Sequence, residues 1–191
     1  PIHSEYYVKN ADFISCSLDT YIFKFDMIAN LKKGGTFLLN TNMDDATLIA
    51  SMPNRMKHLL AEKEAKFYVI DANKLALEAG MGRHTNTTLQ AAFFKLSPQI
   101  MPYEQAEEWM KKFAKKTYEK KGMDVVQKNW DAIDAGAGAL VKIDVPADWA
   151  NATEEAHVEH LEGPEKTVAM VRNIMEPVGR MNGDSLPVSA F

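Results

Sequence analysis

The sequence predicts an α/β fold in which helices flank a parallel sheet, followed by a C-terminal extended strap. One short apolar run, at residues 36–40, is continuous rather than alternating, which is typical of a parallel strand buried on both faces; the runs at 11–17 and 66–71 are also expected to be strands. Stretches with helical periodicity separate these runs, and this order implies right-handed crossovers. Beyond Asp148 the chain becomes acidic and poor in large apolar residues. We therefore expect an α/β domain at 1–150 and a linker or strap at 151–191.

The first unit of the sheet is expected between residues 11 and 40. A short apolar strand at 11–17 leads into a helix at 20–33, and Gly34-Gly35 would end that helix before the buried strand at 36–40. The helix prediction depends on four apolar residues that share one helical face: Phe23, Met27, Ile28 and Leu31. A strand, a crossover helix and a second parallel strand form one unit of a Rossmann-like sheet.

The remaining elements follow from the same kinds of signal. Pro53 suits the first turn of a helix that runs to about Ala65, and a strand follows at 66–71. Gly and Pro residues then separate four helical stretches, at 72–79, 86–96, 103–121 and 123–140. The alternating stretch 141–146 ends in a proline, which favours a short strand at the edge of the sheet. Within the strap we expect one short amphipathic stretch, at 168–174.

Composition excludes several classes of protein. The net charge of −4 argues against a general nucleic-acid binder. No apolar run reaches the length of about 18 residues that a membrane helix needs, and residues 1–7 lack the regions of a signal peptide. Cys16 is the only cysteine, which excludes an intramolecular disulfide framework and fits a reducing compartment. We expect a cytoplasmic protein with no nucleic-acid partner and no membrane partner.

Five stretches of the sequence together resemble a known family. They are NADFISCSLDTYIFKFDMIANLKKGGTFLLNT at 10–41, KFYVIDA at 66–72, EAGMGR at 78–83, NTTLQAAFF at 86–94 and KKGMDVVQ at 120–127. These stretches are similar to the third domain of pyruvate:ferredoxin (or flavodoxin) oxidoreductases. That domain is equivalent to the gamma subunit of the multi-subunit 2-oxoacid:ferredoxin oxidoreductases. The resemblance covers residues 1–149.

The resemblance implies a component of an oxidoreductase. Enzymes of this family oxidise pyruvate with thiamine diphosphate and Mg²⁺, and they pass the electrons through [4Fe-4S] clusters to ferredoxin or flavodoxin. They transfer the acetyl group to coenzyme A. The resemblance further implies contacts with other domains or subunits of the same oxidoreductase, and a homodimer of the full enzyme.

Several parts of that machinery are missing from the sequence. One cysteine cannot ligate a [4Fe-4S] cluster, which takes four thiolates, and no Gly-Asp-Gly segment of the kind that builds the family's thiamine site is present. The family's glycine-rich phosphate loop is also missing, so we expect a fragment that begins inside its domain, with no catalytic residue and no metal site. The alternative is a non-catalytic structural or docking module. The absence of Gly-x-Gly-x-x-Gly argues against an independent nucleotide-dependent enzyme.

The first candidate site is the corner at residues 80–87. Two glycines and Arg83 precede a predicted helix that Thr85 or Asn86 could cap, and Gln90 lies one turn further on. A helix N-terminus offers unpaired N–H groups and a partial positive charge, so this corner could bind a phosphate or pyrophosphate. The alternative is an ordinary turn with a cap and a solvated arginine. The resemblance favours Arg83, Asn86 and Gln90 as coenzyme A contacts, because this domain is associated with coenzyme A binding in the family.

The second candidate site follows the carboxyl end of the strand at 36–40. Open α/β sheets place their ligands at this edge, so Asn40 and Asn42 could contact a ligand or another domain. They could equally be turn residues, as Asp44 and Asp45 are expected to be.

Two further patterns carry weaker expectations. The helix at 103–121 presents a dense basic face that could guide coenzyme A or an acidic ferredoxin, although a solvated face is the simpler interpretation; its lysines are Lys111, Lys112, Lys115, Lys116, Lys120 and Lys121. His157 and His160 are spaced for one helical face. They lack the arrangement of the zinc-protease motif and a third ligand, so we expect no metal there.

Overall fold

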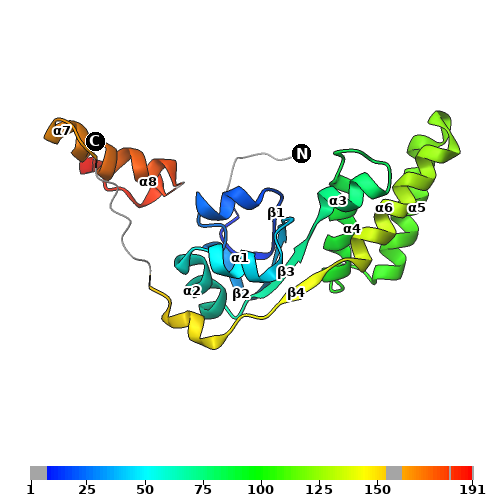
Figure 1. Cartoon of the computed structure of the whole chain (residues 1–191), viewed down its shortest axis with the longest axis horizontal. Helices are drawn as coiled ribbons and strands as arrows, with labels where there is room; N and C mark the ends of the chain where they lie inside the picture. Colours follow the sequence, from blue (N-terminus) through cyan, green and yellow to red (C-terminus); the bar gives the residue numbers. More distant parts are fainter. Residues whose placement is uncertain (1–7, 154–160, 181, 191) are drawn as a thin grey trace.

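A computed structural model describes residues 8–153, 161–180 and 182–190. Its centre is a four-stranded sheet in the order β1 (Ala11–Cys16), β2 (Leu31–Asn40), β3 (Lys66–Ile70) and β4 (Val141–Ile143). The first three strands are parallel, and β4 pairs antiparallel with β3 at the edge. Helices lie on both sides of this sheet (Figure 1). The predicted α/β fold with flanking helices is therefore confirmed, as is the edge position of the last strand.

The two faces of the sheet are covered by different helices. On one face, α1 (Asp45–Ser51) and α2 (Asn54–Glu62) pack against Phe37, Leu39 and Phe67, all of which are buried. On the other face, α3 (Ala72–Glu78) and α4 (Asn86–Leu96) pack around Leu38. Neighbouring residues of a strand point to opposite faces, so burial on both sides explains the continuous apolar run that the sequence shows.

Two long helices extend the second face outward. The helices α5 (Tyr103–Tyr118) and α6 (Met123–Gly138) pack against each other and against α4, where Ala91, Met110 and Ile133 form a small buried cluster. Gly136 allows α6 to approach α4 closely, because a Cβ at this position would lie 2.3 Å from the carbonyl oxygen of Thr88. This pair projects away from the sheet (Figure 1).

The helix predicted at 20–33 is wrong. Only the short 3₁₀ helix η1 (Asp19–Phe23) forms, turns follow, and β2 already begins at Leu31. Gly34-Gly35 therefore lies within β2 instead of ending a helix. Pairing with β1 decides this conformation: the register moves from Ala11 opposite Leu31 to Phe13 opposite Thr36, and Gly34 takes a φ of 75° at the irregularity. The Lys63 ammonium also donates to the carbonyl oxygens of Ala29 and Leu31, each at 2.7 Å.

The turn expected at Asp44 and Asp45 begins a helix. The Asp44 carboxylate accepts hydrogen bonds from the backbone N–H and the hydroxyl of Thr47, at 3.0 and 2.6 Å, and so caps α1. These bonds, chiefly the one from the Thr47 hydroxyl, hold the pKa of Asp44 below its usual value. The sequence pattern missed α1 because the helix is short and has Leu48 as its one buried residue.

The chain leaves the domain along α2. A 3₁₀ turn, η3 (Ala147–Asn151), packs on this helix, and the Asn54 amide donates to the Thr153 carbonyl at 3.0 Å. A helical run then follows, made of α7 (Glu165–Met170), the π-helical stretch η4 (Val171–Met175) and α8 (Glu176–Gly179). This run is longer than the amphipathic stretch expected at 168–174. It lies on the α2 side of the molecule (Figure 1).

Candidate functional site

Asn40 holds three segments together at the carboxyl edge of the sheet. It is 4% exposed, and its side-chain amide donates to the Ser17 carbonyl at 3.0 Å. The Asn40 amide oxygen accepts from the backbone N–H of Ala72 at 2.9 Å. Both ends of the side chain therefore bond to the backbone that continues β1 and β3. The neighbouring Asn42 is exposed to solvent.

A second polar contact, which the sequence analysis did not single out, fixes the same edge. The Thr41 hydroxyl donates to the Asp19 carboxylate at 3.0 Å and accepts from the backbone N–H of Met43 at 3.2 Å. Asp71 caps α3 by accepting from the backbone N–H of Lys74 at 2.9 Å. No sequence motif links Asp19 to Thr41; only the parallel pairing of β1 with β2 brings them together. The edge is thus preorganised by its own hydrogen bonds.

The corner at 80–86 has the predicted form of a turn before a helix. Gly80 and Gly82 have φ values of 73° and 62°, which glycine adopts without steric strain. Thr85 is the N-terminal capping residue of α4, but its side chain makes no capping hydrogen bond. The first N–H groups of α4 therefore have no capping side chain, and these groups together with the helix dipole favour an anion.

The three candidate residues of the corner are all exposed to solvent. Asn86 and Gln90 are both exposed and lie one turn apart on the same face of α4. Arg83 is exposed in the turn that precedes the helix. The structure separates this group from Asn40, because α3 lies between them and a helix of that length spans roughly 10 Å. The sequence thus predicted two candidate sites, and in the structure they remain separate.

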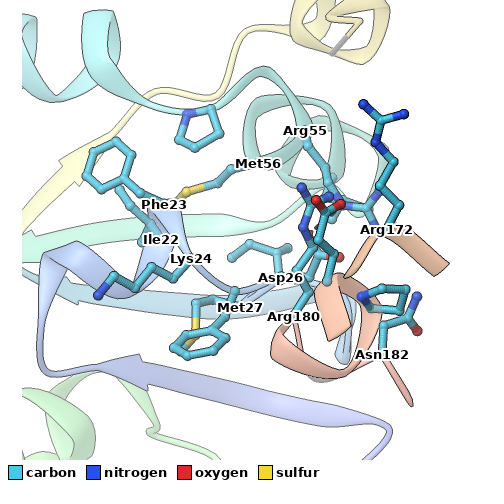
Figure 2. Close-up of a pocket in the computed structure, with 16 residues that line it drawn as sticks. Ile22, Phe23, Lys24, Asp26, Met27, Arg55, Met56, Arg172, Arg180 and Asn182 are labelled. Atoms are coloured by element: carbon cyan, nitrogen blue, oxygen red, sulfur yellow. Dashed lines mark hydrogen bonds and ion pairs between the residues drawn. The ribbon is translucent and has the colours of Figure 1, made fainter. Parts of the chain in front are cut away.

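A cavity of about 560 Å³ lies elsewhere, between the body of the domain and the C-terminal helical run. Its walls come from residues 22–28, from the first turns of α2 and from five residues of the C-terminal part: Arg172, Glu176, Pro177, Arg180 and Asn182. Figure 2 shows Arg55, Asp26, Arg180 and Arg172 on one side of it and Phe23, Ile22 and Met56 on the other. The sequence predicted no site from these residues, because the three segments are far apart in the chain and form no motif.

The structure describes most of the other residues that the sequence singled out. Six lysines were expected on the basic face at 103–121. One of them, Lys111, instead pairs with Glu107 at 2.7 Å and Asp134 at 2.6 Å, and these ion pairs link α5 to α6. Burial raises the pKa of the Cys16 thiol, whose sulfur donates to the Leu18 carbonyl at 3.1 Å. His157 and His160 lie outside the described residues. Over the ranges that the structure describes, no group of three metal-ligating side chains occurs and no helix is long and apolar enough to cross a membrane.

These features define an α/β domain with a mostly parallel sheet, a strand edge held by its own hydrogen bonds and a helix corner without a capping side chain. The chain belongs to the pyruvate ferredoxin/flavodoxin oxidoreductase family, whose model matches residues 1–139. It is 40% identical to a pyruvate-flavodoxin oxidoreductase of Enterobacter agglomerans and 37% identical to a pyruvate:ferredoxin oxidoreductase of Moorella thermoacetica. Each alignment covers 100% of this chain and 16% of the relative. The expected family is confirmed, and the similarity extends beyond the predicted limit at residue 149.

The fold is also found in a solved structure. The pyruvate oxidoreductase subunit PORC of Thermotoga maritima matches with a TM-score of 0.56 and 20% sequence identity, over 72% of this chain and 67% of that one. At this level of identity the match concerns the fold alone. It agrees with the predicted α/β fold.

Proposed function

We propose that this chain is one component of a pyruvate:ferredoxin (or flavodoxin) oxidoreductase. The complete enzyme would convert pyruvate and coenzyme A to acetyl-CoA and CO₂, with electrons passing to ferredoxin or flavodoxin. The observation that carries this proposal is the 40% identity to a pyruvate-flavodoxin oxidoreductase over the full length of the chain. The chain spans 16% of that relative, so the reaction belongs to the larger assembly, which the family resemblance suggests is a homodimer.

The residues of this chain do not fit an iron–sulfur cluster. Cys16 is its only cysteine, is 1% exposed and donates its thiol hydrogen to a backbone carbonyl, whereas a cluster needs four thiolates. The thiamine-binding segment expected of the family is also missing from the sequence. We therefore assign thiamine diphosphate, Mg²⁺ and the clusters to other parts of the enzyme.

The contribution that this chain can make is to binding coenzyme A. The N-terminus of α4 supplies backbone N–H groups without a capping side chain, and Arg83 would add charge-assisted hydrogen bonds to an anionic group. Asn86 and Gln90 would bind the neighbouring polar atoms of the ligand. Asn42 would contact the ligand at the second candidate site, the carboxyl edge of β2. Asn40, whose amide already bonds to Ser17 and Ala72, would hold that edge in shape.

One observation favours the alternative of a structural or docking module. Trp109 and Phe113 are 46% and 53% exposed, and their ring centroids lie 5.8 Å apart on the surface of α5. Exposed aromatic residues of this size are enriched at protein interfaces. Such a face could bind another part of the same assembly without any ligand at the α4 corner.

Kinetics of the complete enzyme separate the two functions. Arg83→Ala should raise the KM for coenzyme A about tenfold to more than a hundredfold, because losing a charge-assisted hydrogen bond costs roughly 1.5–3 kcal/mol. The KM for pyruvate should change little, since pyruvate reacts at the thiamine. Lys74→Ala, which removes an exposed charge from the neighbouring α3, is the matched control. Equal shifts in both constants for Arg83→Ala would favour the docking module.

A second variant tests the proposed role of Asn40. Asn40→Ala should lower the melting temperature, because the Ser17 carbonyl and the Ala72 N–H each lose their partner. Asn42→Ala should leave the melting temperature unchanged and act only on the KM for coenzyme A. A change in KM for Asn40→Ala at unchanged stability would instead make Asn40 a direct contact.

A further inference from the structure

The cavity between the body and the C-terminal helical run combines charged and apolar walls. Arg55, Arg172 and Arg180 line it together with two carboxylates, those of Asp26 and Glu176. Three guanidinium groups against two carboxylates leave a net positive charge on this side. Lys24, also at the rim, adds to it. The electrostatics of the cavity therefore favour an anionic ligand.

The charges are already partly organised. The Arg55 side chain donates to the Asp26 carboxylate at 2.5 Å, which fixes one arginine at the wall. Arg172 and Glu176 of the C-terminal run and Arg180, which directly follows α8, all line the cavity. Within the described part of the chain Arg180 makes no ion pair with a carboxylate. Its guanidinium is thus available to form the two parallel hydrogen bonds that suit a carboxylate.

The opposite wall is apolar. Ile22, Ile28 and Met56 are buried at 4%, 1% and 6% exposure and form the floor. Phe23 lines the same cavity but is 48% exposed, which is unusual for a large aromatic residue beside a buried floor. Figure 2 shows Phe23 and Met56 across the cavity from Arg180 and Arg172. A cavity of this volume is within the range of small-molecule sites.

We propose that this cavity binds an organic monocarboxylate with an apolar body. The carboxylate would pair with Arg180, and the body would lie on Phe23 and the apolar floor. The site is shared between two ends of the chain, so ligand binding would require the C-terminal run to lie against residues 22–28. The cavity is on the α2 side of the sheet, whereas the corner at Arg83 precedes α4 on the other face (Figure 1). This assignment is independent of the proposed coenzyme A site.

Calorimetric titration of the 191-residue chain with three probes tests the charge and the apolar body separately. Benzoate should bind saturably. Benzamide has the same shape without the charge, and acetate has the charge without the ring; each should bind about tenfold more weakly or not detectably. Added salt should weaken benzoate binding, because the attraction is electrostatic. Equal binding of benzoate and benzamide, or no saturable benzoate binding, would overturn the proposal.

Two substitutions, one on each side of the cavity, test whether the site is shared. Arg180→Gln should weaken benzoate about tenfold or more. Phe23→Ala should weaken benzoate while leaving acetate unchanged. Lys142→Gln removes an exposed cation of β4, outside the cavity, and is the matched control; circular dichroism checks that each variant is folded. Benzoate binding that survives Arg180→Gln would show that the C-terminal run takes no part, and the shared site would be wrong.

Discussion

The α/β body and the C-terminal helical run are stabilised in different ways. Every residue that is buried in the described part of the chain belongs to the body, from Cys16 to Ile143. The C-terminal run buries none of its described residues and leaves Met170, Met175 and Val178 at 55%, 55% and 50% exposure. Apolar burial is the main source of folding free energy. The body therefore supplies the stability, whereas the run is a surface element whose position depends on what it lies against.

The largest expected effect comes from deleting a ring in the body. Phe37 is fully buried between the sheet and the α1–α2 layer, and its ring centroid lies 5.6 Å from that of Phe67. Phe37→Ala should lower the free energy of unfolding by roughly 3–5 kcal/mol, from lost burial and the cavity left behind. In the C-terminal run, the exposed Val178→Ala should change it by no more than about 0.5 kcal/mol. Urea denaturation of both variants measures the contrast, and comparable losses would contradict the division between the two regions.

Two glycine substitutions test the same comparison between the body and the C-terminal run, with smaller expected changes in the free energy of unfolding. A Cβ at Gly136 would lie 2.3 Å from the Thr88 carbonyl oxygen, so Gly136→Ala must push α6 away from α4 and should cost roughly 1–3 kcal/mol. At Gly179, the last residue of α8, a Cβ would meet no atom within 4 Å. Gly179→Ala should be neutral or stabilise by up to about 1 kcal/mol, because alanine is the better helix former. A destabilising Gly179→Ala would mean that the run packs more tightly than its exposure indicates.

The smallest effect concerns a hydroxyl group of the body and depends on pH. Burial, together with the carboxylates of Glu107 and Asp134, raises the pKa of Tyr103 to about 12 from an ordinary value of 10.0. The folded state thus holds this proton more tightly than the unfolded state. The contribution of Tyr103 is complete below pH 10 and is lost as the pH rises toward about 12.

Tyr103→Phe isolates this contribution. The Tyr103 hydroxyl is buried without a hydrogen-bond partner in the described part of the chain, so the variant should match the wild type at pH 7. Between pH 10 and 12 the variant should lose less stability than the wild type. Melting temperatures across this range measure the difference, and parallel curves would show that the hydroxyl is not desolvated in solution.

The local sequence pattern was sufficient to predict an element where burial and periodicity agree. The continuous apolar run at 36–40 predicted a strand covered on both faces, and Phe37, Leu38 and Leu39 are indeed fully buried. The helix predicted at 86–96 coincides with α4, because the glycine turn before it and Ser97-Pro98 after it both limit the helix. The motif-based resemblance also led to the correct family. These features depend on residues that are close in sequence.

Tertiary structure alone decided the conformation of residues 20–40 and the position of the cavity. The apolar spacing from Phe23 to Leu31 would suit a helix. However, the backbone near Leu31 is extended, because pairing with β1 and the hydrogen bonds from Lys63 supply partners for its polar groups. Buried backbone groups must be paired, and a partner that is distant in sequence can supply the bond as well as a neighbour. For the same reason no local pattern joins Arg55 to Asp26 or brings Arg180 into the same cavity as Phe23. The sequence by itself determined the fold class, most of the elements and the family, whereas the strand pairing decided where the crossover runs and which side chains meet.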